Sequence, residues 1–146
     1  MTVIKRAALV PYSAAEMFAL VADIPSYPQF LPWCAAARVL SRDEHVVVAT
    51  IDIRYSGLRH SFTTRNTLRR DSMMDMQLVD GPFSHLNGCW RFDALDERAC
   101  KISLDLDFAA AKGALNMMIA PVFTRIANQM VGGFHQRAAQ LYGVRT

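Results

Sequence analysis

Residues 44–68 read EHVVVATIDIRYSGLRHSFTTRNTL, and this stretch decides the fold class because it repeats with a period of two on both sides of a turn. Before the turn, one face of the predicted strand is apolar and carries Val47, Ala49, Ile51 and Ile53. After the turn, one face carries Phe62, Thr64, Asn66 and Leu68. Residues 56–58 (SGL) are typical of a tight connection. The stretch therefore predicts two antiparallel strands joined as a hairpin.

Five other segments have the same strand character, and short connections separate most of them: residues 2–10, 35–41, 72–80, 86–95 and 99–109. The chain therefore predicts seven strands in an antiparallel meander. Ser13 and Glu16 form a capping box, which predicts a first helix that ends at about residue 22 or 23.

A long amphipathic helix is predicted from about residue 113 to residue 142, with Pro121 marking a kink or a fresh start. Its expected buried stripe consists of Leu115, Ile119, Val122, Phe123, Ile126, Met130, Phe134 and Leu141. One sheet face must meet this helix, so we expect an α+β architecture in a single domain that spans residues 1–146.

The charge pattern argues against a nucleic-acid stripe. The net charge is +3 and the pI is about 9.0, but the basic residues are scattered. We therefore expect no DNA partner, although the charge permits an anionic partner such as a membrane surface or ribosomal RNA. Three cysteines without a CxxC pair indicate neither a disulfide framework nor a zinc site. The segment at 114–131 carries Arg125 and Pro121, so it is not a membrane span.

No set of residues typical of catalysis is apparent. The four histidines fall in turns, at strand starts or on the polar helix face, and Asp105 and Asp107 lie opposite an apolar stripe. No phosphate-binding glycine loop or nucleophile elbow is present. We therefore expect no enzymatic activity, no metal and no catalytic cofactor.

Two aromatic segments stand out instead. Residues 27–34 (YPQFLPWC) hold two prolines and three aromatic residues without a charge, and residues 80–92 (DGPFSHLNGCWRF) hold three more aromatic residues. Uncharged aromatic side chains in a loop broken by prolines need something apolar to pack on. We expect Phe30 and Trp33 to lie at the mouth of an apolar cavity, and the alternative is that they cap the end of the core under a loop.

These two segments, together with residues 51–68 and the order of the elements, resemble the coenzyme-Q-binding, START-like family of the polyketide cyclase and lipid transport superfamily. The resemblance covers about residues 3–142, and the superfamily includes a branch of ribosome-association toxins. It implies a helix-grip fold, in which a seven-stranded antiparallel sheet curves around a long C-terminal helix and leaves a deep hydrophobic tunnel. It also implies a ligand, ubiquinone or a similar prenyl lipid, that is bound without chemistry.

The residues assigned to the ligand site are apolar, except for two polar candidates for the head group. They are Phe30, Trp33, Ile51, Phe62, Thr64, Asn66, Met76, Phe83, Leu86, Trp90, Phe92, Met118, Val122, Ile126 and Met130. Arg65 and Tyr55 are further candidates for the head group. Alternatively, the apolar stripe of the long helix belongs to the hydrophobic core and contacts no ligand.

Three functions remain open from the sequence. The first is a carrier of ubiquinone or another polyprenyl quinone that supports respiration and contacts a membrane transiently. The second is a toxin that binds the large ribosomal subunit and blocks subunit association, and the third is a polyketide cyclase or aromatase. Because residues 1–10 (MTVIKRAALV) lack the apolar region of a signal peptide, we expect a cytoplasmic protein, with a peripheral position at the inner face of the plasma membrane as the alternative.

Overall fold

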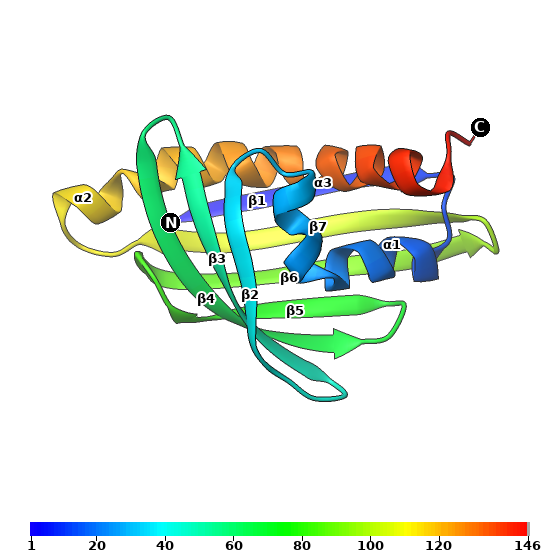
Figure 1. Cartoon of the computed structure of the whole chain (residues 1–146), viewed down its shortest axis with the longest axis horizontal. Helices are drawn as coiled ribbons and strands as arrows, with labels where there is room; N and C mark the ends of the chain where they lie inside the picture. The colour runs from blue at the N-terminus through cyan, green and yellow to red at the C-terminus, as the bar shows by residue number, and fades with distance from the viewer. Residues whose placement is uncertain (146) are drawn as a thin grey trace.

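A single curved antiparallel sheet and one long helix form the body of the protein (Figure 1). The computed structural model describes residues 1–145. The strands are β1 (Thr2–Val10), β2 (Cys34–Arg42), β3 (Val46–Tyr55), β4 (Leu58–Arg69), β5 (Met73–Asp80), β6 (Phe83–Asp96) and β7 (Ala99–Ala110). They lie in the order β1-β7-β6-β5-β4-β3-β2. The predicted antiparallel meander of seven strands is confirmed, with β1 added beside β7.

The helical segments are α1 (Ala14–Ala22), the 3₁₀ helix η1 (Ile24–Gln29), α2 (Ala114–Met117) and α3 (Ile119–Tyr142). The sheet wraps around α3, and α1 and η1 close the other side of the core (Figure 1). The predicted α+β helix-grip architecture is therefore confirmed. Within residues 1–145, no helix combines the length and the apolar character needed to span a membrane.

The hairpin predicted from residues 44–68 forms as expected. Its register runs from Val46 opposite Thr67 to Tyr55 opposite Leu58. At its tip, Ser56 and Gly57 both have positive φ values, 48° and 81°. A two-residue turn with this backbone conformation has a twist that matches the twist of the two strands it joins. The predicted apolar face of β3 is buried, and Thr64 and Asn66 of β4 are buried on the same side of the sheet.

The capping box at the start of α1 is also present. The Ser13 hydroxyl accepts a hydrogen bond from the Glu16 amide at 3.0 Å, and the Glu16 carboxylate accepts one from the Ser13 amide at 2.9 Å. Arg145 donates to both oxygens of the Glu16 carboxylate, at 2.8 and 3.0 Å. These contacts, with the Arg145 bond foremost, lower the pKa of Glu16 to about 2. Glu16 thus joins α1 to the end of the chain.

The C-terminal helix is interrupted at Met118, so Pro121 lies in the first turn of α3. The missing amide hydrogen of a proline costs no hydrogen bond there, which explains the fresh start. The expectation that Leu115 and Leu141 are buried is wrong, since they are 77% and 52% exposed. Leu115 belongs to the separate helix α2, which buries no residue, and at the last turn Tyr142 packs against the core instead of Leu141.

Candidate functional site

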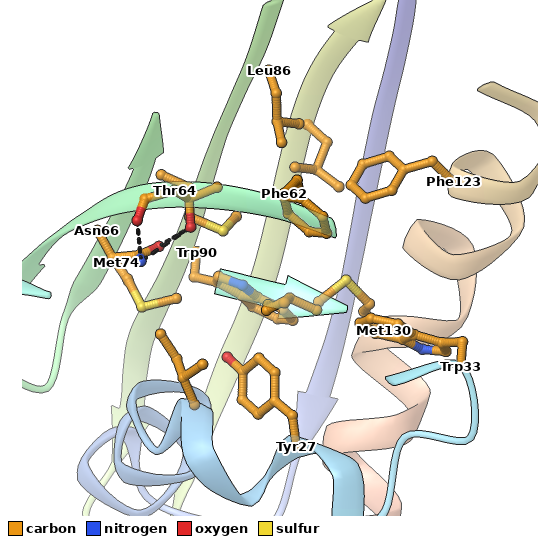
Figure 2. A pocket seen from close by; sticks show the side chains of 14 residues that line it. Tyr27, Trp33, Phe62, Thr64, Asn66, Met74, Leu86, Trp90, Phe123 and Met130 are labelled. Atoms are coloured by element: carbon orange, nitrogen blue, oxygen red, sulfur yellow. Dashed lines mark hydrogen bonds between the residues drawn. The ribbon is translucent and has the colours of Figure 1, made fainter. Parts of the chain in front are cut away.

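An apolar pocket lies between the concave face of the sheet, η1 and α3 (Figure 2). Its walls bring together nine of the residues assigned to a ligand site from the sequence. They are Trp33, Ile51, Phe62, Thr64, Asn66, Met76, Leu86, Trp90 and Met130. Alternation along the strands and helical spacing on α3 account for eight of them, because both periods place residues on the face that meets the other layer. Trp33 lies in the turn before β2 and was assigned from the aromatic segment 27–34.

The structure places the other six assigned residues outside the pocket wall. Phe83, Phe92 and Ile126 are buried in the core, where neighbouring side chains cover them. Val122 is half-buried at the edge of the core, and Met118 is 55% exposed at the break between α2 and α3. Phe30 packs against Tyr27 and Phe134, with the Arg137 guanidinium 5.0 Å from the centre of its ring.

Five lining residues were not among the assigned ones: Ile24, Tyr27, Met74, Leu106 and Phe123. Tyr27 is part of the aromatic segment 27–34, and Phe123 is on the predicted helix stripe, so both carried a signal in the sequence. Ile24, Met74 and Leu106 carried no signal that separates a pocket wall from ordinary core, because alternation marks both in the same way.

The aromatic segment 27–34 packs inward instead of forming an open mouth. Tyr27, Leu31 and Trp33 are buried, and the rings of Tyr27 and Phe134 lie 5.3 Å apart with their planes steeply inclined. A side chain at Gly133 would meet the Leu31 side chain at 3.0 Å, so the loop approaches α3 closely. The apolar residues of this loop are therefore accounted for by contact with α3 and with the pocket.

The pocket is much smaller than the deep tunnel that the resemblance implied. Its volume is about 40 Å³, whereas sites for drug-sized ligands measure roughly 300–1,000 Å³. The expectation of a deep tunnel is wrong for this conformation, because rings from both layers interlock in the space. Phe123 of α3 lies 5.7 Å from Phe62, 5.0 Å from Phe83 and 4.8 Å from Phe108, between ring centres.

Polar groups in the wall are few and mostly paired. The Asn66 amide donates to the Val47 carbonyl at 3.0 Å and to the Thr64 hydroxyl at 3.1 Å, and the Tyr27 hydroxyl donates to the Val21 carbonyl. Burial raises the pKa of Tyr27, so this hydroxyl stays protonated. Among residues 1–145, the indole nitrogen of Trp90 finds no hydrogen-bond partner.

Neither Arg65 nor Tyr55 lies in the pocket wall, so the structure does not bring these two candidates for a head-group contact to the pocket. Arg65 points to the outer face of the sheet and is exposed, and Tyr55 lies at the end of β3. The described lining also holds no carboxylate and no imidazole. It therefore shows no acid or base of the kind that a cyclase site would use.

On the outside of the sheet, a basic feature lies at the β3–β4 hairpin. Arg54 and Arg59 are directly opposite each other in the antiparallel register, and both are exposed. Arg38 forms an ion pair with Asp52 at 3.0 Å, whereas no such pair is found for Arg54 or Arg59 among residues 1–145. Like charges directly opposite in a sheet repel each other. We refer to Arg54 and Arg59 as the arginine pair.

Known proteins resemble this chain over nearly its whole length. Ribosome association toxin RatA of Pseudomonas aeruginosa is 47% identical over 142 residues, which are 97% of this chain and 99% of that protein. The mitochondrial coenzyme Q-binding protein COQ10 homolog B of Xenopus laevis is 29% identical over 136 residues, which are 90% of this chain and 56% of that protein.

Two solved structures share the fold at low sequence identity. The Zhui aromatase/cyclase from Streptomyces sp. R1128 matches with a TM-score of 0.83 and 17% identity, covering 99% of both chains. A START superfamily protein from Mycobacterium smegmatis matches with a TM-score of 0.80 and 18% identity, covering 95% of this chain and 98% of that one. These two likenesses show the helix-grip fold alone.

Residues 10–135 match the family described as polyketide cyclase/dehydrase and lipid transport. That range includes six of the seven strands, the pocket wall, the arginine pair and most of α3. The sheet wrapped around a long helix is the architecture that the resemblance implied, with a small apolar pocket in place of the deep tunnel. The chain belongs to the polyketide cyclase/dehydrase and lipid transport family.

Proposed function

We propose that this protein binds the large ribosomal subunit and blocks the association of the two subunits. The observation that carries the proposal is the 47% identity to a ribosome association toxin over 97% of the chain. The arginine pair adds a physical reason, because an RNA phosphate would bind both guanidinium groups and remove their mutual repulsion. Binding of this kind needs no catalytic group.

Sedimentation of ribosomes tests this proposal. We expect the purified protein to co-sediment with the large subunit and to prevent separated large and small subunits from joining when they are mixed. Because phosphate contacts release counterions, the affinity should fall as the salt concentration rises. A protein that stays at the top of the gradient at low salt, with the ribosome peaks unchanged, would contradict the proposal.

The pocket supports a second candidate, the carriage of ubiquinone or another apolar ligand. Its wall is apolar apart from a few polar groups, as in sites for greasy ligands. The lipid transport description of the family and the name of the Xenopus relative point the same way. A prenyl chain would enter only after the pocket widens, and Met76, whose methyl end covers Gly88, is flexible enough to move.

A carrier of this kind would work in the cytoplasm and contact the inner face of the membrane transiently. Helix α2 offers a suitable surface, since it exposes Leu115 and Met117, with Met118 directly after it. Lys112 precedes these apolar side chains and is exposed, so it can contact anionic head groups. Neither proposed function includes a catalytic step.

Extraction of bound lipid tests the second candidate. From cells that make quinones, we expect the wild-type protein to carry a prenyl quinone, identified by mass spectrometry in the solvent extract. Met76→Phe fills the pocket and should remove the lipid, because the interlocked core leaves no other space for it. Met73→Phe, on the outer face of the same strand, is the matched control and should keep it. An empty extract from folded wild-type protein would contradict this candidate.

A further inference from the structure

The indole nitrogen of Trp90 is a buried hydrogen-bond donor without an acceptor in the part of the chain that the structure describes. Trp90 lies on β6, its side chain has no exposed surface, and it forms part of the pocket wall. Figure 2 shows the indole among the lining side chains, with its nitrogen toward the side that carries Asn66 and Thr64. Buried polar groups are nearly always paired, so an unpaired donor at a cavity wall indicates that something else supplies the acceptor.

The neighbouring polar groups do not supply that acceptor. The Asn66 amide is bonded to the Val47 carbonyl and the Thr64 hydroxyl, and Thr64 in turn donates to Asn66 Oδ1 at 3.3 Å. The rest of the wall near Trp90 is apolar, with Met74 opposite it on β5. Leu104, opposite Trp90 on β7, is buried and apolar as well. The N–H group of the Trp90 indole is therefore a free donor in a pocket whose other described side chains are apolar or already hydrogen-bonded.

The size and the chemistry of the space limit what can occupy it. A volume of about 40 Å³ admits only a few atoms, so a ring with its substituent enters when the pocket widens, as it must for a prenyl chain. A water molecule is a poor occupant, because buried waters typically make about three hydrogen bonds and the neighbouring groups are already paired. A carbonyl oxygen needs only one donor, and an indole N–H is a donor only.

We propose that the pocket binds a flat, largely apolar molecule through a ketone-type or quinone-type carbonyl oxygen, which accepts a hydrogen bond from Trp90 Nε1. This inference rests on the second proposed function, the binding of an apolar ligand in the pocket. It adds the orientation of that ligand, with its carbonyl end toward Trp90. It also adds selectivity for carbonyl compounds over hydrocarbons of the same shape.

The test uses two aromatic probes of similar size, acetophenone and ethylbenzene, of which only the first carries a carbonyl group. The chain has two tryptophans, so an ¹⁵N spectrum contains two indole signals, and Trp90→Phe assigns them. This substitution keeps an aromatic ring and removes the donor. We expect acetophenone to move the Trp90 indole proton signal downfield in the wild-type protein, and ethylbenzene to bind without that shift.

The affinities should separate in the same way. We expect Trp90→Phe to weaken acetophenone binding roughly tenfold, the effect of one neutral hydrogen bond, and to leave ethylbenzene binding within about twofold. If both probes bind and the substitution affects them equally, the carbonyl contact is wrong while the pocket function stands. If neither probe binds the wild-type protein, the carbonyl contact and the binding of apolar ligands in the pocket are both wrong.

Two further outcomes are informative. A water signal that persists at the Trp90 indole proton in the presence of acetophenone would show that a trapped water is the acceptor, and would overturn the inference. If Trp90→Phe does not fold, the indole shift in the wild-type protein decides alone. A downfield shift with acetophenone supports the carbonyl contact, and an unmoved signal at saturation overturns it.

Discussion

Replacing Phe123 by alanine is expected to lower the free energy of unfolding by about 4 kcal/mol. The Phe123 side chain is buried where α3 meets the sheet, and its ring makes edge-to-face contacts with Phe62, Phe83 and Phe108. The substitution removes three aromatic pairs and leaves a cavity that this interlocked core cannot close. Urea unfolding followed by circular dichroism would measure the loss.

Two variants define the scale of this effect. Phe123→Leu keeps most of the apolar volume and should cost less than half as much as the alanine variant. Leu115→Ala, on exposed α2, should change the free energy of unfolding by no more than about 0.5 kcal/mol. A loss below about 1 kcal/mol for Phe123→Ala would show that α3 does not hold the sheet in the way that the ring contacts indicate.

Reversing the charges of the arginine pair, Arg54→Glu with Arg59→Glu, is expected to weaken ribosome binding about 100-fold at low salt. Two phosphate contacts are lost, and two carboxylates then repel the RNA, so each position contributes about tenfold. The two glutamates still face each other with like charges, so the cross-strand repulsion is retained and the fold should be little affected. Quantitative co-sedimentation over a salt series would measure the affinity and its salt dependence.

The matched control reverses two basic residues at the other end of the sheet. Arg98 lies in the β6–β7 turn and Lys101 follows it on β7, far from the β3–β4 hairpin (Figure 1). Arg98→Glu with Lys101→Glu changes the net charge by the same amount as the test variant. Equal weakening by both variants would indicate attraction by overall charge, and would contradict a contact at the arginine pair.

The sequence by itself determined the elements of this fold. Periods of two and of about 3.6 residues reflect which side chains are buried along one element, so the hairpin at 44–68 and the stripe on α3 follow from local pattern. The capping box at Ser13 and Glu16 also acts within one helical turn, and the structure contains it as predicted. The family could be inferred from two aromatic segments for the same reason, because their residues are close in the sequence.

Only the tertiary structure decided which buried residues line a space and which fill it. Phe62 and Phe83 have the same pattern in the sequence, yet Phe62 lines the pocket and Phe83 is plain core. The difference depends on how the side chains of β4, β6 and α3 interlock, which is a property of packing in three dimensions. The arginine pair depends on the strand register. The free Trp90 donor depends on which side chains of the described residues surround it, none of which supplies an acceptor. Neither is set by any one segment alone, because each requires distant residues to meet.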